Sequence, residues 1–140
     1  MIILDTNVVS EPMKRGGNPA VEAWLNRQLA ETLYLTTVNL AELLVGLEFL
    51  PDGKRKKGLK SALNELITRL FGARILAFDR EAAETYATLV GRARVAGHAL
   101  SVADAQIAAI ATACGYAVAT RDTVPFAAVG VSTINPWKTI

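Results

Sequence analysis

The stretch that decides the fold is Met1-Ile-Ile-Leu-Asp-Thr-Asn, in which an apolar run is followed at once by polar residues. This pattern is typical of a buried strand that ends in a turn exposing its side chains. The same arrangement returns near the C-terminus, where Tyr116-Ala-Val-Ala precedes Thr120-Arg-Asp. We therefore expect two buried strands, each followed closely by a carboxylate, Asp5 after the first and Asp122 after the second.

Between these two strands, apolar residues at helical spacing alternate with short runs of β-forming residues. Further strands are predicted over residues 33–37, 74–78 and 129–134, and helices over residues 19–29, 40–50, 54–70, 80–96 and 102–114. This alternation predicts one α/β domain over residues 1–140, with a mainly parallel sheet flanked by helices. In such sheets, ligands bind beyond the carboxyl ends of the strands.

Size and composition fit a protein of one domain. The chain has 140 residues, and domains most often contain about 100–150. The hydrophobic fraction of 51% and the mean hydropathy of +0.29 indicate helices with broad buried stripes. Asp5 interrupts the N-terminal apolar run, which excludes a signal-peptide core. The uncharged stretch over residues 105–120 is shorter than the roughly 20 residues that a membrane span needs.

The single cysteine and the net charge limit the chemistry further. Cys114 has no second cysteine with which to form a disulfide, so we expect a buried packing role and a reducing, cytoplasmic compartment. The net charge of +2 is too small to indicate a nucleic-acid-binding protein by itself. Ser10 and Ser101 lack an accompanying His–Asp set, which disfavours serine hydrolysis.

Four acidic residues stand where an α/β sheet places its site. Asp5 and Asp122 follow strands, and Glu42 and Asp104 are expected in the first turns of two helices. Helix capping or turn formation explains Glu42, Asp104 and Asp122 equally well when each is taken alone. Asp5 is harder to explain, because a carboxylate directly against an apolar strand is costly unless it is paired or bound to a metal.

Convergence of these acids would require a cation. Neighbouring carboxylates repel each other, so at least one pKa must rise unless a cation is bound. Oxygen ligands select Mg²⁺ or Mn²⁺, and a chain with one His and one Cys has no zinc-type ligand set. Carboxylates that hold Mg²⁺ near a basic surface are suited to phosphodiester hydrolysis.

Basic residues occur as one block and as a neighbour of an acid. The block Lys54-Arg55-Lys56-Lys57 fits a solvated helix end, contact with RNA, or contact with an acidic partner equally well. Arg121 either pairs with Asp122 or contacts a substrate phosphate. His98 lies in a Gly-His-Ala-Leu loop, and the sequence suggests no partner for it.

Five segments in order resemble the motifs of PIN-domain toxins of the VapC type, especially the FitB-like branch. They are Met1-Ile-Ile-Leu-Asp-Thr-Asn-Val-Val-Ser-Glu-Pro, Asn39-Leu-Ala-Glu-Leu-Leu-Val-Gly, Ser101-Val-Ala-Asp-Ala-Gln-Ile-Ala-Ala, Ala119-Thr-Arg-Asp-Thr and Asn135-Pro-Trp. The resemblance runs from residue 1 to about residue 137. It implies the PIN fold, an α/β/α sandwich. Each motif alone is weak, but their order and spacing together are specific.

The resemblance also implies an activity, an endoribonuclease toxin that hydrolyses RNA through a metal-activated water and leaves a 5′-phosphate and a 3′-hydroxyl. The acids Asp5, Glu42, Asp104 and Asp122 would hold one or two Mg²⁺ or Mn²⁺ ions. Thr6, Asn7, Thr120 and Arg121 would position water, acids or phosphate. The implied partners are a cognate antitoxin whose C-terminal segment blocks the acidic cleft, a second copy of the chain in a homodimer, and operator DNA in a larger complex.

Two other functions fit the same residues less well. A catalytically silent module could keep the fold and bind RNA or a protein through the basic block, but loss of an acid would be expected there. An aspartate phosphotransferase of the haloacid-dehalogenase type requires a second acid two residues after its nucleophile, and Asn7 occupies that position.

Overall fold

The computed structural model describes residues 1–138, and the last two residues of the predicted 1–140 domain lie outside this range. Within the described residues, the strands form one parallel five-stranded sheet in the order β3-β2-β1-β4-β5. The strands are β1 (Ile2–Leu4), β2 (Leu33–Thr36), β3 (Ile75–Leu76), β4 (Ala117–Ala119) and β5 (Thr133–Ile134). The first strand therefore lies at the centre of the sheet.

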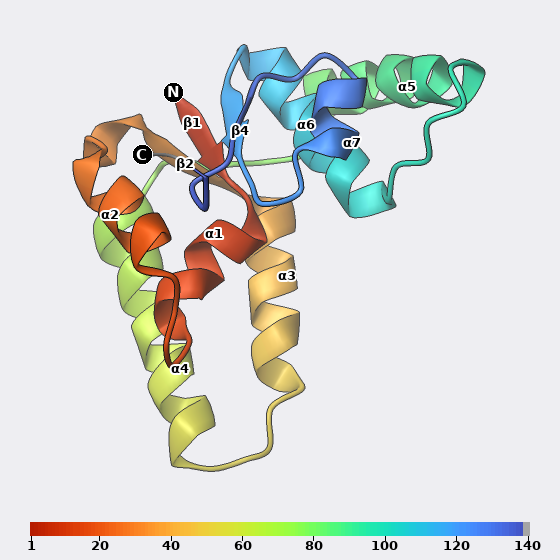
Figure 1. Ribbon diagram of the computed structural model, residues 1–140. Helices are drawn as coiled ribbons and strands as arrows, with labels where there is room; N and C mark the ends of the chain where they lie inside the picture. Colours follow the sequence, from red (N-terminus) through yellow and green to blue (C-terminus); the bar gives the residue numbers. More distant parts are fainter. Residues whose placement is uncertain (139–140) are drawn as a thin grey trace.

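Helices cover both faces of the sheet (Figure 1). The α-helices are α1 (Thr6–Ser10), α2 (Pro19–Arg27), α3 (Thr37–Glu48), α4 (Lys54–Leu66), α5 (Arg80–Val95), α6 (Val102–Cys114) and α7 (Val124–Ala128). Shorter helical segments are η1 (Glu11–Met13), η2 (Ala30–Thr32) and η3 (Ile67–Phe71). No helix in the described part of the chain has the length and apolar character needed to cross a membrane.

Side chains alternate between two apolar cores along the strands. Leu4 of β1 packs in a core with helices α1 to α4, whereas Ile3 packs in a second core with α5, α6 and α7. Ala119 and Val118 of β4 divide between the cores in the same way. A parallel sheet buried on both faces requires apolar residues at every position of its strands, as the N-terminal run has. The predicted α/β/α sandwich is confirmed.

The segment after β1 differs from the turn expected there. Residues 6–10 form helix α1, and the Asp5 carboxylate accepts a hydrogen bond from the Thr6 backbone N–H as its N-cap. Asp5 is buried rather than exposed, since only 7% of it is accessible to solvent. The helix is only 5 residues long, too short for apolar periodicity to indicate it in the sequence.

Three further expectations need correction. Glu42 lies beyond the first turn of its helix, because the Thr36 cap starts α3 at Thr37, earlier than the apolar spacing indicated. Cys114 is exposed rather than buried, at the last residue of α6. The region predicted as strand over residues 129–134 forms β5 only at Thr133–Ile134, and the unpredicted helix α7 precedes it.

Candidate active site

The Asp5 carboxylate is held by hydrogen bonds from three different elements. Its Oδ1 accepts from the Thr6 backbone N–H at 2.8 Å and from Asn39 Nδ2 at 3.2 Å. Its Oδ2 accepts from Thr120 Oγ1 at 2.7 Å. Burial raises the pKa of Asp5, the hydrogen bonds from Thr120 and Thr6 oppose that rise, and the charges of Asp104 and Glu42 add to it. The structure thus fixes a carboxylate in a place that disfavours its charge.

Strand register brings Thr120 to Asp5. Leu4 of β1 pairs with Ala119 of β4, and the Asp5 backbone N–H donates to the Ala119 carbonyl at 2.9 Å. The residues that follow the two strands therefore meet at the carboxyl edge of the sheet. Thr120 Oγ1 also accepts from the Asp122 backbone N–H at 3.2 Å. One buried hydroxyl thus links the central acid to the segment that carries the last acid.

Asn39 belongs to one of the sequence motifs and lies in the site, although no role was predicted for it. It is fully buried, and with Thr36 it forms the capping box of α3, in which the Thr36 backbone N–H donates to Asn39 Oδ1 at 3.2 Å and the Asn39 backbone N–H donates to Thr36 Oγ1 at 3.0 Å. This leaves Asn39 Nδ2 to donate to Asp5 Oδ1 and, at 3.3 Å, to Thr6 Oγ1. The signal available in the sequence was the spacing Thr36-x-x-Asn39, which resembles a capping box.

Glu42 reaches the same cluster through Thr6. Thr6 Oγ1 donates to Glu42 Oε1 at 2.9 Å, while the Thr6 backbone N–H is bound to Asp5. Glu42 is exposed on α3, so its carboxylate borders solvent.

Asp104 and Asp122 complete the acidic set on the other side. The Asp104 backbone N–H donates to Ser101 Oγ at 3.1 Å, the N-cap of α6. Burial raises the pKa of Asp104, a hydrogen bond with Ser101 opposes this rise, and the charge of Asp122 adds to it. Asp5 is thus close enough to feel the charges of Glu42 and Asp104, and Asp104 is close enough to feel the charge of Asp122. Within residues 1–138, no three acidic, His or Cys side chains surround a single point as metal ligands.

Asn7 and Arg121 join the two ends of the chain beside this cluster. The Arg121 backbone N–H donates to Asn7 Oδ1 at 3.4 Å, and the Asn135 side chain donates to the Arg121 carbonyl at 3.4 Å. The Arg121 guanidinium lies 5.3 Å from the centre of the Trp137 ring. Among the described residues Arg121 forms no ion pair with Asp122, so the first of its two expected roles is absent here.

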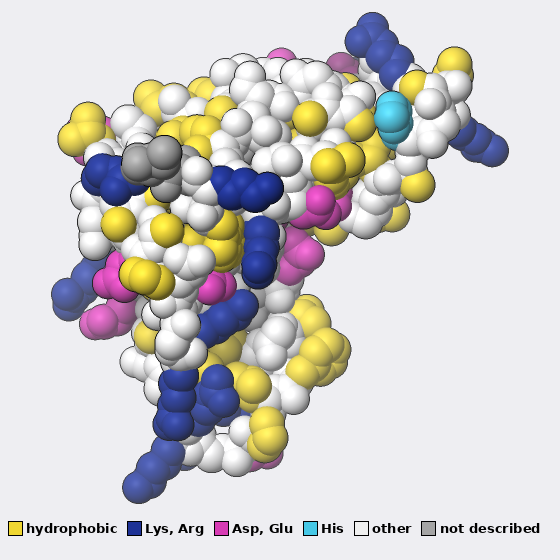
Figure 2. Space-filling model, in the orientation of Figure 1, with side chains coloured by type: hydrophobic (Ala, Val, Ile, Leu, Met, Phe, Trp, Pro, Cys, Tyr) yellow, Lys and Arg dark blue, Asp and Glu magenta, His cyan; other side chains and the backbone are white. Residues whose placement is uncertain are grey.

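The basic block lies at the start of α4, as predicted, but its members differ. Lys56 pairs with Asp52 at 3.2 Å, whereas Lys54 and Lys57 are exposed. Arg55 lines a groove of about 360 Å³ whose other lining residues include Thr6 and Glu42. On the face drawn in Figure 2, several Lys and Arg side chains lie to the left of and below the central Asp and Glu side chains, and others lie at the upper right. The single histidine lies at the upper right as well.

Comparison with known proteins identifies the family of this chain. The model of the PIN domain matches residues 2–131, and the chain belongs to the PIN-domain family. The resemblance found in the sequence motifs is confirmed.

Relatives of known name match the chain over nearly its whole length. It is 49% identical to a plasmid stability protein, StbB, of Pseudomonas syringae pv. tomato, with 99% of each chain covered. It is 45% identical to the VapC ribonuclease Y4jK of Sinorhizobium fredii, again with 99% of each chain covered. It is 43% identical to Toxin FitB of Neisseria gonorrhoeae, with 98% of this chain and 99% of the toxin covered.

Solved structures agree. FitAcB from Neisseria gonorrhoeae matches with a TM-score of 0.95 and 42% identity, covering 99% of this chain and 100% of that one. FitAB bound to an IR36 DNA fragment matches with a TM-score of 0.96 and 41% identity, covering 100% and 98%. VapBC-5 from Mycobacterium tuberculosis, a member of the VapBC family of toxin-antitoxin systems, matches with a TM-score of 0.65 and 25% identity, covering 94% of each chain.

Proposed function

We propose that this protein is a metal-dependent endoribonuclease that acts as the toxin of a toxin–antitoxin pair. The observation that carries the proposal is the buried Asp5 carboxylate at the carboxyl edge of the sheet, with the charges of Asp104 and Glu42 close enough to raise its pKa. A buried acid beside like charges is typical of a functional site, because folding alone gains nothing from this arrangement. The relatives named a ribonuclease and a toxin favour RNA hydrolysis over other chemistry.

The donor set fits a hard divalent cation. Asp5, Glu42, Asp104 and Asp122 offer carboxylate oxygens only, which suit Mg²⁺, with Mn²⁺ as a substitute. Glu42 and Asp122 are exposed, so their side chains can turn toward Asp5 when a cation offsets the repulsion, although Glu42 would then exchange its hydrogen bond from Thr6 for the cation. When bound, the cation supplies charge neutralisation and acidifies a coordinated water.

The chain's own residues orient the site. Thr6, Asn39 and Thr120 hold both oxygens of Asp5 in one direction, so the carboxylate needs no reorganisation when substrate binds. Arg55 lines the groove beside Glu42 and Arg121 directly precedes Asp122, so both would attract the RNA backbone, with Lys54 and Lys57 adding positive charge in the first turn of α4. Water attacks phosphorus, the bond to the 3′ oxygen breaks, and that oxygen gains a proton. The products are a 5′-phosphate and a 3′-hydroxyl.

The proposed partners follow from the relatives and from the groove beside the acids. The groove of about 360 Å³ is lined mainly by apolar residues of α3 and α4 and opens next to Thr6 and Glu42. A cognate antitoxin that places a C-terminal segment in this groove would block access to the acids. The protein would form a homodimer, which would join the antitoxin in a larger complex on operator DNA. It would act in the cytoplasm, where its RNA substrate lies.

The test compares Asp5→Asn with Asp79→Asn. Both positions are N-caps, and Asn caps a helix about as well as Asp does. A mixed RNA pool is incubated with the native protein and with each variant in Mg²⁺, in Mn²⁺ and in EDTA. We expect metal-dependent cleavage by the native protein and by Asp79→Asn, and none by folded Asp5→Asn. Normal cleavage by folded Asp5→Asn would refute the assignment. RNA binding with neither metal binding nor cleavage would support the silent interaction module instead.

The Asp5→Asn variant should also be more stable than the native protein in EDTA. An amide at this position carries no charge, and its oxygen still accepts from Thr6 and Asn39. Its Nδ2 donates to Thr120 Oγ1, whose hydroxyl proton can rotate away. Urea unfolding in EDTA measures this gain, which we expect to be about 1–3 kcal/mol for relief of an unfavourably buried charge. A less stable Asp5→Asn protein would contradict the argument.

A further inference from the structure

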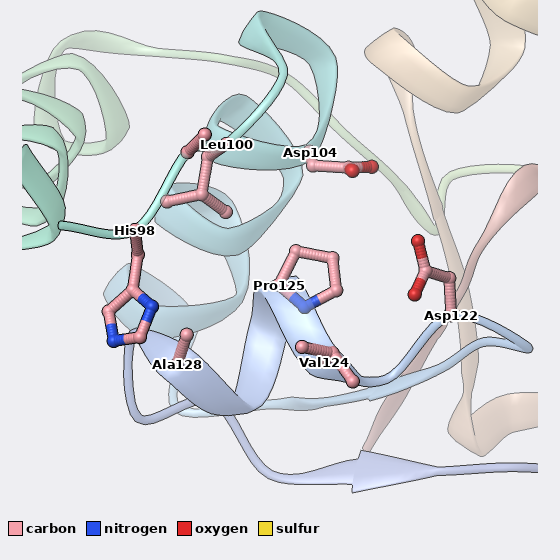
Figure 3. A pocket seen from close by; sticks show the side chains of 8 residues that line it. His98, Leu100, Asp104, Asp122, Val124, Pro125 and Ala128 are labelled. Carbon is pink, nitrogen blue, oxygen red and sulfur yellow. The ribbon is translucent and has the colours of Figure 1, made fainter.

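A second cavity opens beside Asp104 and Asp122, whereas the groove that Arg55 lines opens beside Thr6 and Glu42. We name this second cavity the α6–α7 pocket. It has a volume of about 340 Å³ and is lined by His98, Ala99, Leu100, Asp104, Asp122, Val124, Pro125 and Ala128. Figure 3 shows the carboxylates of Asp104 and Asp122 at one end of the pocket and His98 at the other, with Pro125 between them. The pocket is therefore continuous with the proposed reaction centre.

The walls of this pocket carry less positive charge than the walls of the groove beside Glu42. The groove contains Lys14 and Arg55, whereas the residues that line the pocket include no Lys or Arg in the described part of the chain. Its middle is formed by apolar side chains, among them Leu100 and Val124. A phosphate gains nothing from such walls. A nucleobase is a flat ring with apolar faces and polar edges. Its faces can pack on the apolar middle of the pocket while an edge forms hydrogen bonds with His98, which lies at the far end in Figure 3.

The loop that carries His98 is fixed at both ends. At its start, α5 closes with the hydrogen bonds of a Schellman motif, in which the His98 backbone N–H donates to the Ala93 carbonyl at 2.8 Å and Gly97 has a φ of 77°. At its end, Ser101 caps α6 through the Asp104 backbone N–H. The same short loop thus sets the positions of the histidine and of one acid relative to each other.

The His98 imidazole is free to bind a ligand. Within residues 1–138, its backbone N–H forms the hydrogen bond to Ala93, but its ring nitrogens have no protein partner. A neutral imidazole offers one donor and one acceptor, and its ring also stacks on bases. These properties match the edge or the face of a nucleobase, and they match neither the sugar nor a phosphate as well.

We propose that the α6–α7 pocket binds the nucleobase next to the scissile phosphate, and that His98 is the residue that contacts this base and biases the choice of cleavage site. This proposal rests on the proposed ribonuclease function. An RNA strand would then cross the acids with its backbone toward Arg55 and one base turned into the pocket. His98 is assigned to positioning and specificity and has no proton-transfer role.

Binding is tested first, without any reaction. His98 is the only histidine in the chain, so its ring gives one set of imidazole signals in a ¹H–¹³C NMR spectrum. The native protein in EDTA is titrated with adenosine, guanosine, cytidine and uridine, and with ribose as the control that lacks a base. We expect saturable shifts of the His98 signals that differ between nucleosides and are absent with ribose. Equal responses to ribose and to all nucleosides, or no response, would overturn the proposal.

Two variants of matched bulk test the place of binding. Ala99→Trp fills the pocket from an exposed position, and Val95→Trp adds the same ring to an exposed residue of α5 outside the pocket. We expect Ala99→Trp to weaken nucleoside binding by about 10-fold or more, because its ring would occupy the space of the base and so abolish the base stacking that contributes strongly to such sites. Val95→Trp should leave it unchanged. Equal effects of the two variants would exclude the pocket as the binding site.

Cleavage of the mixed RNA pool then tests the consequence for specificity. We expect His98→Ala to reduce the preference for one base beside the cleaved bond by about 3- to 10-fold, as for loss of one hydrogen bond. An unchanged distribution of bases at that position would refute the role of His98. Base-specific NMR shifts in a protein that cleaves no RNA would reject the ribonuclease function and leave base binding by the pocket intact.

Discussion

Thr120→Val tests whether one buried hydroxyl governs the reactivity of Asp5. Val has nearly the shape of Thr, so the change removes the 2.7 Å hydrogen bond to Asp5 Oδ2 without opening a cavity. Thr120 is fully buried and only 7% of Asp5 is exposed, so water cannot easily replace that bond. A hydrogen bond to a charged group contributes about 1.5–3 kcal/mol. At roughly 1.4 kcal/mol per factor of ten, the loss corresponds to about 10- to 100-fold in cation affinity or cleavage rate.

The matched control is Thr120→Ser, which keeps the hydroxyl and removes a buried methyl group. In urea unfolding, Thr120→Val should lose about 1.5–3 kcal/mol through the hydrogen bonds, and Thr120→Ser should lose about 1 kcal/mol through lost burial. Only the Val variant should lose activity when initial cleavage rates are measured against Mg²⁺ concentration. If Thr120→Val cleaves within about 3-fold of the native rate, or if both variants lose activity equally, the hydroxyl does not orient Asp5 as argued.

Two other predictions concern the basic block and a structural acid. Replacing Lys54 and Lys57 by Gln should lower the salt dependence of single-stranded RNA binding by up to about 1.4 in log–log slope, at about 0.7 per phosphate contact. Lys60→Gln is the control, since Lys60 already pairs with Glu48 at 2.8 Å, and identical slopes would favour a solvated helix end. Glu11→Gln should cost about 1 kcal/mol of unfolding free energy at pH 7. The Asn18 backbone N–H holds the pKa of Glu11 below its ordinary 4.5, so its stabilisation is present above pH 4.5 and is lost as the pH falls through the lower folded value. A constant difference between Glu11→Gln and the native protein from pH 7 to pH 3 would contradict this.

Sequence patterns predicted most of the regular elements because those patterns are local. The cap at Asp79 and the glycine at position 115 each act within a few residues, and α5 and α6 begin and end where they indicate. The apolar spacing over residues 54–70 likewise predicted a helix, which the structure divides into α4 and the π-helical segment η3. The α-helices that were missed, α1 and α7, are each 5 residues long, and the missed segments η1 and η2 are shorter still. A segment of that length contains little more than one helical turn, so its apolar residues show no period.

Only those site residues that stand next to a predicted strand or helix start could be named from local patterns. The four acids could be named from their places after strands and near helix starts, but Asn39 could not be assigned to the site. Its side chain reaches Asp5 across 34 positions of sequence, and Thr120 reaches Asp5 across 115. Contacts between residues so far apart in the sequence leave no pattern in the residues around either partner.

The sequence by itself determined the alternation of strands and helices, the acids that follow the strands, and the motifs of the PIN family, because each depends on neighbours along the chain. Only the tertiary structure decided that β1 lies between β2 and β4, so that three elements enclose Asp5 and bury its charge. It also decided that the loop before α6 and the helix α7 form a pocket beside the acids. Strand order and burial arise from packing between distant segments, and that packing free energy is shared by the whole core rather than carried by any local run of residues.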